Sequence, residues 1–308
     1  MVLTSDAHCD TITLTYQNNE VLLKNLGHLD LTRLSRPWLQ FFAVFVYPAD
    51  YPDRQISEYM KYLNFMDTQI ADNTALVDKV TSSVQLVETV KNNKIAVIYA
   101  IEGADCIESV EHVDLLYDKG VRSIGIVWNH KNALGSGVDY NEGLTQLGKN
   151  VIRRMEELGI IIDVSHTCRK TFDDIIDNTS GPIIASHSNS FSLCNHLRNL
   201  ADDQIQTIAQ RKGYIGLNLY PPFLSTTGNT NLDDVISHYK HITHIGGADI
   251  IGLGCDFDGV EDLPIGIMDV SSIHIIFDKM KEIGFPEQSI RNFRGENLYN
   301  FIVGLQYW

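Results

Sequence analysis

The sequence is poor in basic residues. Its 308 residues contain 24 Lys and Arg against 39 Asp and Glu, which gives a formal net charge of −15 at pH 7. Such an acidic surface repels nucleic-acid backbones and anionic membranes, so neither is expected as a partner. Small-molecule substrates fit this charge better, and part of the acidic excess is available to hold bound cations.

The sequence also lacks the features of export and of membrane attachment. Its five cysteines are an odd number without a CxxC pair, which is typical of reduced thiols in the cytoplasm and leaves no visible thiolate zinc site. No apolar run reaches the ~18 residues of a membrane span, and neither a signal sequence nor a hydrophobic GPI-attachment tail is recognisable. We therefore expect a cytoplasmic protein without a membrane anchor.

Short apolar runs alternate with longer stretches of helical character along the whole chain. Runs rich in Val, Ile and aromatic residues, each followed by a helix, are typical of parallel strands joined by crossovers. Eight such units predict an α/β fold, a single (β/α)8 TIM barrel domain over residues 1–308, with extra helices or loops after the first two strands. The predicted strands are Val2–Asp10, Phe41–Pro48, Ile95–Gly103, Arg122–Asn129, Ile160–His166, Ile183–His187, Tyr214–Tyr220 and Ile250–Asp256, and the predicted helices are Ile56–Asp72, Val84–Asn92, Val113–Lys119, Thr145–Leu158, Asp202–Arg211, Asp233–Ile245 and Ser272–Ile283.

The ends of the predicted strands carry an unusual set of side chains. In this fold the active site lies at the C-terminal ends of the strands. Polar residues end strands in any protein, which explains one or two such endings but not a repeated choice of histidine or carboxylate. Five of the eight runs end in a potential metal ligand, and the candidates are His8, Asp10, Glu102, His166, His187 and Asp256.

These candidates suit two metal ions. His8 and Asp10 are one residue apart, so on a strand both point to the same face and can chelate one ion. Glu102 can bridge two cations, and His166 and His187, from neighbouring strands, can converge on a second ion that imidazoles favour, such as zinc. Two divalent cations would balance the three carboxylates of the set and a bridging hydroxide, which favours two metals over one.

The ordered set of motifs around these residues resembles the renal or membrane dipeptidase family of zinc peptidases, whose barrels are of the metal-dependent hydrolase type. The resemblance spans nearly the whole chain and ends in a segment similar to the family's final barrel helix. The motifs are His8-Cys-Asp10, Ile101-Glu-Gly103, Asp163-Val-Ser-His166, Ser186-His187-Ser188, Gly254-Cys-Asp256-Phe-Asp-Gly259 and Arg294-Gly-Glu-Asn297-Leu-Tyr-Asn-Phe301.

The resemblance implies a zinc-dependent dipeptidase with two Zn²⁺ per chain. By this carry-over His8 and Asp10 hold the first zinc, His166 and His187 hold the second, and Glu102 bridges them.

Asp256 is implied to lie beside the first zinc, where it accepts a proton from the bridging water and passes it to the leaving amine. The implied substrates are small dipeptides, including L-Xaa-D-Xaa dipeptides, attacked by a metal-bridging hydroxide. Hydrolysis of carbapenem-like lactams is an implied side activity.

Three segments are implied to contact the substrate. Arg198 lies in a stretch similar to the family's carboxylate-binding loop, where a guanidinium would pair with the C-terminus of the dipeptide. After the fourth predicted strand the family often has an oxyanion-stabilising histidine, and either Asn129 or His130 fills that position. Phe223 falls where some relatives carry a tyrosine near the substrate.

Other interpretations are open to test. Another two-metal amidohydrolase, acting on a lactone, cyclic amide or phosphoester, would usually begin with HxH and use a modified lysine as the bridge. A non-catalytic barrel would have no reason to keep all six ligands. The serines near the histidines have no GxSxG setting, which argues against a serine hydrolase.

Two further features have plain structural interpretations. His238, His241 and His244 recur every three residues on a predicted helix, and we expect a solvated helix face rather than a metal site. The apolar segment 301–308 packs either on the barrel or on the second subunit of a homodimer, and the sequence leaves both open.

Overall fold

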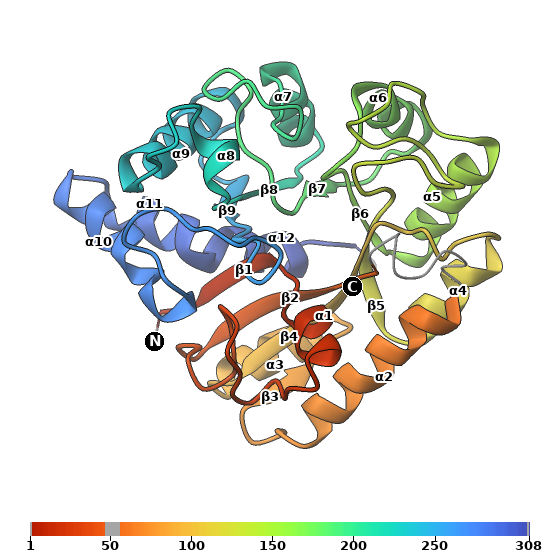
Figure 1. Cartoon of the computed structure of the whole chain (residues 1–308), viewed down its shortest axis with the longest axis horizontal. Helices are drawn as coiled ribbons and strands as arrows, with labels where there is room; N and C mark the ends of the chain where they lie inside the picture. The colour runs from red at the N-terminus through yellow and green to blue at the C-terminus, as the bar shows by residue number, and fades with distance from the viewer. Residues whose placement is uncertain (1, 47–55, 307) are drawn as a thin grey trace.

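A closed barrel of eight parallel strands forms the centre of the molecule (Figure 1). The computed structural model describes residues 2–46, 56–306 and 308. The ring closes where β2 pairs with β4 and β1 pairs with β9, and a short ninth strand, β3, pairs with the start of β4. The predicted (β/α)8 barrel is therefore confirmed. The strands are β1 (Thr4–Cys9), β2 (Trp38–Phe45), β3 (Val77–Lys79), β4 (Ile95–Glu102), β5 (Val121–Gly125), β6 (Ile161–Asp163), β7 (Ile183–Ala185), β8 (Tyr214–Leu217) and β9 (Ile251–Leu253).

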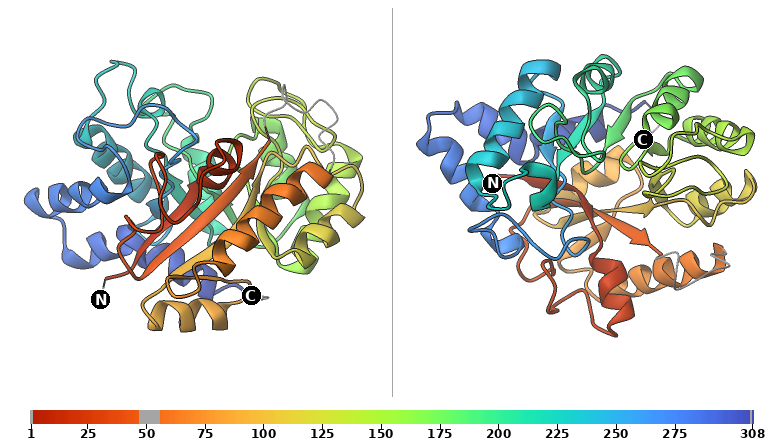
Figure 2. Two further views of the ribbon diagram at one scale, coloured as in Figure 1. Left: turned by 60° about the horizontal axis from the view of Figure 1, so that its bottom comes forward. Right: turned by 45° about the horizontal axis from the view of Figure 1, so that its top comes forward.

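Helices surround this ring and cover its outer face (Figures 1 and 2). The seven predicted helices are present with ends within two residues of the expected positions. The helix between β6 and β7, α6, is among those that were not predicted; its N-cap is Cys168, whose sulfur accepts from the Thr171 amide, rather than one of the usual capping residues. The helices are α1 (Thr11–Gln17), α2 (Ile56–Ala71), α3 (Ser83–Lys91), α4 (Glu111–Asp118), α5 (Gln146–Leu158), α6 (Arg169–Asn178), α7 (Asp202–Gln210), α8 (Pro221–Leu224), α9 (Leu232–Gly246), α10 (His274–Glu282), α11 (Glu287–Arg291) and α12 (Asn297–Val303), with a 3-10 turn at Val270–Ser272 and a π-helical turn at Asn292–Glu296.

The strands are apolar on both faces because both faces are covered. In β2, Trp38 and Phe42 belong to one buried cluster, whereas Leu39 and Phe41 belong to another. Side chains alternate across a strand, so continuous apolar sequence is what a barrel strand buried on both sides requires.

Several strands end earlier than the apolar runs suggested. β6 stops at Asp163 rather than His166, β7 at Ala185 rather than His187, and β9 at Leu253 rather than Asp256. The predicted end of the second strand, residues 47–48, lies outside the described residues. The candidate ligands therefore lie at the strand ends or in the first residues of the following loops.

The C-terminal segment packs on the barrel. The Trp308 indole donates to the Gly159 carbonyl at 3.1 Å, and the Ser83 hydroxyl donates to the Trp308 carbonyl at 2.8 Å. Residues 301, 305 and 308 lie against the smaller buried cluster, and both chain ends lie at the bottom of the left view in Figure 2. Packing on the barrel is thus observed for these residues, and a homodimer stays a prediction. No helix in the described ranges is long and apolar enough to cross a membrane.

Candidate metal centre and active site

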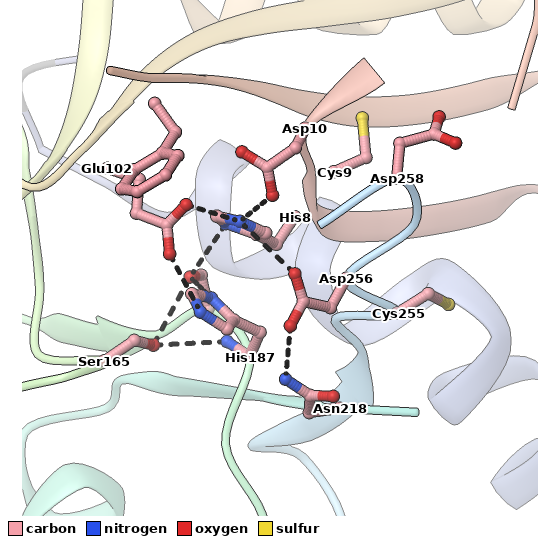
Figure 3. A network of polar contacts seen from close by, with 12 residues as sticks. His8, Cys9, Asp10, Glu102, Ser165, His187, Asn218, Cys255, Asp256 and Asp258 are labelled. Carbon is pink, nitrogen blue, oxygen red and sulfur yellow. Dashed lines mark hydrogen bonds and ion pairs between the residues drawn. The ribbon is translucent and has the colours of Figure 1, made fainter. Parts of the chain in front are cut away.

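The six candidate ligands converge at the end of the barrel where the strands finish. Figure 3 shows His8, Asp10, Glu102, His187 and Asp256 pointing toward one another. All six side chains are buried. They come from β1, β4 and the loops after β1, β6, β7 and β9, so only the closed barrel brings them together.

The first group of ligands forms around the His8 imidazole. Its Nε2 atom lies 3.3 Å from Asp10 Oδ2, 3.4 Å from Glu102 Oε2 and 3.8 Å from Asp256 Oδ1. Ligand atoms of His8, Asp10 and Asp256 lie within 4.8 Å of one another. The second oxygen of Asp10 is buried without a hydrogen-bond partner in the described part of the chain. Three carboxylates around one imidazole, one of them with an unpaired buried oxygen, fit a cation well.

The second group forms around the other carboxylate oxygen of Glu102. Oε1 lies 2.7 Å from His166 Nε2 and 3.4 Å from His187 Nε2, and the two Nε2 atoms are 2.8 Å apart. His187, Glu102 and His8 also offer ligand atoms within 4.8 Å of one another. Glu102 thus faces both groups, one with each oxygen.

The hydrogen bonds behind these two histidines set their tautomers. Nδ1 of His166 lies 2.7 Å from the Asn129 amide oxygen, which can only accept, so this nitrogen carries the proton. The Ser186 hydroxyl donates its proton to Asp163 and lies 2.7 Å from His187 Nδ1, which therefore donates to it. Both Nε2 atoms are therefore unprotonated, and each carries a lone pair. Two such nitrogen atoms close together fit a shared cation.

Burial keeps these two imidazoles neutral. Burial and the charge of Arg198 lower the pKa of His166 to about 3, and burial and the charge of His8 lower the pKa of His187 to about 4. A neutral imidazole is the form that binds a metal ion.

Two of the three carboxylates, Asp10 and Asp256, have raised pKa values. Burial and repulsion from Glu102 raise the pKa of Asp10 to about 8, and burial also raises the pKa of Asp256. Burial acts on Glu102 too, but the charge of His8 and the contacts of Glu102 with His166, His187 and His8 together outweigh burial and hold the pKa of Glu102 well below its usual range. Divalent cations in this position would stabilise all three ionised carboxylates.

The backbone near the centre adopts conformations that most residues avoid. His166 and Asp256 have φ angles of 68° and 63°, in the left-handed region. Close by, a Cβ atom on Gly259 would lie 2.3 Å from Asp10 Oδ2 and 2.4 Å from Asp256 Oδ1. Only glycine lets this turn approach the two carboxylates.

Two adjoining cavities open beside the ligands, and His166 lines both. The first, of about 830 Å³, is lined by Asp10, Glu102, Asn129, Phe223 and Asp256 among others. The second, of about 550 Å³, has the buried Arg198 in its wall.

Arg198 lines the smaller cavity and lies close to Phe223, which lines the larger one. Its Nη2 donates to the His187 carbonyl at 3.2 Å, and its guanidinium carbon lies 5.4 Å from the centre of the Phe223 ring. Burial lowers the pKa of Arg198 to about 10, which leaves the side chain charged at neutral pH. A fixed, buried guanidinium can hold a carboxylate at this place.

The structure separates the two alternatives after β5. Asn129 lines the larger cavity and bonds to His166. His130 instead points to Asp105, at 3.3 Å between Nε2 and Oδ1, and packs against the Trp128 ring. Of the two, Asn129 is the one in the described lining of the cavity beside the ligands.

Sequence reasoning missed the residues that orient the ligands. The Asn218 amide donates to Asp256 Oδ2 at 2.8 Å, and Ser186 connects Asp163 to His187. Asn218 directly follows β8, so the same inspection of strand ends could have found it.

One sequence interpretation is wrong. His238 does not lie on a solvated face but is buried, because the loop after β7 and the helix α8 cover it. Its Nδ1 accepts from the Ser190 amide at 3.0 Å, and its Nε2 bonds to the Leu224 carbonyl at 3.0 Å. The residue links three segments and takes no part in the metal centre.

Comparison with known proteins gives consistent matches over the whole chain. The family model described as membrane dipeptidase (peptidase family M19) matches residues 2–303. The structure is similar to a metallopeptidase described as dipeptidase AC of family M19, with a TM-score of 0.91 and 25% identity over 100% of this chain and 99% of that one. It is also similar to a metallopeptidase from Rhodobacter sphaeroides liganded with a phosphinate mimic of the dipeptide L-Ala-D-Ala, with a TM-score of 0.89 and 25% identity over 99% of both chains. A probable dipeptidase from Pseudomonas aeruginosa shares the fold, with a TM-score of 0.89 and 20% identity over 99% of this chain and 96% of that one.

Proposed function

Because the chain belongs to the membrane dipeptidase family, peptidase family M19, and is thus a metal-dependent dipeptidase, we propose that it works with two Zn²⁺ per chain and accepts L-Xaa-D-Xaa dipeptides. The observation that carries the zinc proposal is the position of Glu102, whose two oxygens face two separate groups of ligands. His8, Asp10 and Asp256 would hold one ion, and His166 and His187 the other.

Each group of side chains has a distinct task in this proposal. Two zinc ions would supply a shared water of lowered pKa for attack on the peptide carbon and would polarise the scissile carbonyl. Asp256, held by Asn218 and lining the larger cavity, accepts the proton of the attacking water and returns it to the leaving amine. Asn129 keeps the Nδ1 proton on His166 and offers its amide N–H to the developing negative charge on the substrate.

The substrate is held by its C-terminus. Arg198 is the buried cation beside the centre, and its position in the wall of the second cavity suits a free α-carboxylate. Phe223 supplies an apolar surface next to this guanidinium in place of a hydroxyl contact. Acceptance of a D-residue at the C-terminus is supported by the Rhodobacter sphaeroides relative, which was liganded with a mimic of L-Ala-D-Ala.

A substrate panel tests the proposal. The zinc-loaded protein should cleave L-Ala-D-Ala and L-Ala-L-Ala, lose this activity with a chelator and regain it with zinc. Lactones and phosphotriesters belong in the same panel, because other two-metal barrels cleave them. Turnover of these compounds without turnover of any dipeptide would contradict the proposal.

A further inference from the structure

Unpaired polar atoms are concentrated in the loop that follows β7. Within the described residues, eight buried side-chain nitrogen or oxygen atoms have no hydrogen-bond partner, and four of them fall in residues 188–199. Folded proteins pair nearly all buried polar groups, so a local concentration of unpaired ones calls for a ligand that completes them. The four atoms are Ser188 Oγ, Ser190 Oγ, Arg198 Nε and Asn199 Oδ1.

Two of these atoms can donate and belong to residues that line the same cavity. Ser188 is 1% exposed and Arg198 is 4% exposed, and both line the cavity of about 550 Å³ beside His166. The Ser188 amide N–H donates to the Gly216 carbonyl at 2.8 Å. The Ser188 hydroxyl has no hydrogen-bond partner among the described residues, so it can donate to a ligand. Nη2 of Arg198 donates to the His187 carbonyl, and Nε is buried without a hydrogen-bond partner among the described residues.

The other two atoms do not contribute to an anion site. Ser190 lies outside the described lining of this cavity. Asn199 lines it, but both of its amide bonds go to main-chain carbonyls, of Cys194 and Phe223, and its unpaired atom is an acceptor. The donors available to a carboxylate are therefore a guanidinium N–H and a hydroxyl.

We propose that Ser188 is a second donor, together with Arg198, to the C-terminal carboxylate of the dipeptide, and that the 550 Å³ cavity receives the side chain of that C-terminal residue. A carboxylate has two oxygens, and one hydrogen bond to each fixes both its position and its plane. Apolar walls from Val138, Val164 and Leu200 surround the space next to these donors. This inference rests on the proposed dipeptidase function and adds a specificity-determining residue to it.

Kinetics with paired substrates test the role of Ser188. For L-Ala-D-Ala, Ser188→Ala should raise KM about tenfold and leave kcat within about twofold, because a neutral hydrogen bond to a charged group is lost from binding. For the C-terminal amide of the same dipeptide, variant and wild type should have the same KM. Ser190→Ala is the matched control, since it removes an equally buried and unpaired hydroxyl two residues away and should change neither value.

Zinc content distinguishes substrate binding from a structural role. Ser188 follows the ligand His187 directly, so a variant that merely displaced this ligand would bind less zinc. We expect Ser188→Ala to retain the wild-type zinc content and melting temperature. A loss of zinc, an equal rise in KM for the amide, or the same rise in Ser190→Ala would overturn the proposal.

A binding experiment separates this inference from the proposed function. Calorimetric titration with a non-hydrolysable phosphinate dipeptide, as the free carboxylate and as its methyl ester, requires no turnover. If Ser188→Ala binds the free carboxylate about tenfold more weakly than the wild type but binds the methyl ester equally well, the carboxylate site is supported. This result would hold even if no dipeptide were cleaved, in which case the proposed function alone would fail. Equal binding of the carboxylate by variant and wild type overturns the inference, while cleavage of dipeptides by the wild type would leave the function standing.

Discussion

Replacement of Gly259 by alanine tests the metal centre through a single methyl group. Gly259 does not have a left-handed backbone, so alanine is compatible with its conformation. The new Cβ would nevertheless lie 2.3 Å from Asp10 Oδ2 and 2.4 Å from Asp256 Oδ1. Each carboxylate must move by about 1 Å to reach van der Waals contact.

A displacement of this size is large for a catalytic group. Misplacement by about 1 Å can cost roughly 100-fold in rate, so we expect Gly259→Ala to lower kcat/KM for L-Ala-D-Ala by about this factor. Asp10 and Asp256 belong to the first group of ligands, whereas the second is formed by Glu102, His166 and His187. The zinc content should therefore fall from two toward one per chain.

The control for this variant is Gly181→Ala, whose Cβ would meet the flexible carboxylate of Glu156 at 3.1 Å, away from the ligands. It should retain wild-type activity and zinc content. Kinetics and elemental analysis of both variants provide the measurement. If Gly259→Ala keeps two zinc ions and activity within about threefold of wild type, Asp10 and Asp256 are not ligands of the catalytic centre.

Three further perturbations act on separate parts of the site. Asp256→Asn keeps the shape of the side chain and its contact with Asn218 but cannot accept a proton, so kcat should fall by about 10²-fold or more while zinc is retained. Wild-type activity of this variant would remove Asp256 from the mechanism. Ser186→Ala removes the hydroxyl that connects Asp163 to His187. Competition with a chelating dye should then show that zinc affinity at the second group of ligands is reduced about 10–100-fold. Unchanged affinity would mean that this connection does not orient His187. Removal of zinc should lower the melting temperature, and its return should restore it. A ligand that binds only the folded state stabilises that state, by about 4 kcal/mol when its free concentration is 1,000 times its dissociation constant. Equal melting temperatures with and without zinc would argue against a buried metal site.

The sequence predicted the barrel and the ligand candidates for one reason. Strands buried on both faces leave continuous apolar runs, and the polar residue that ends each run marks the catalytic end of the barrel. Glu102 and His8 could be identified by this rule without any coordinates. The extent of the chain as one domain stays a prediction.

The arrangement around the ligands could not be predicted. Asn129 bonds to His166 from 37 residues away, and Ser186 bonds to Asp163 from 23 residues away, so each pair depends on neighbouring strands of the closed barrel. The apolar runs also concealed where the strands end, because the left-handed turn at His166 leaves no mark in hydrophobicity. His238 was misjudged because its burial results from a distant loop and not from its own helix.

The number of metal ions required for turnover tests the central claim most directly. Zinc would be titrated into the metal-free protein while the rate of L-Ala-D-Ala hydrolysis and the bound zinc are followed together. The two groups of ligands joined by Glu102 predict that activity rises until two zinc ions are bound per chain and then stays constant. Full activity with one zinc per chain, or in the metal-free protein, would contradict the account.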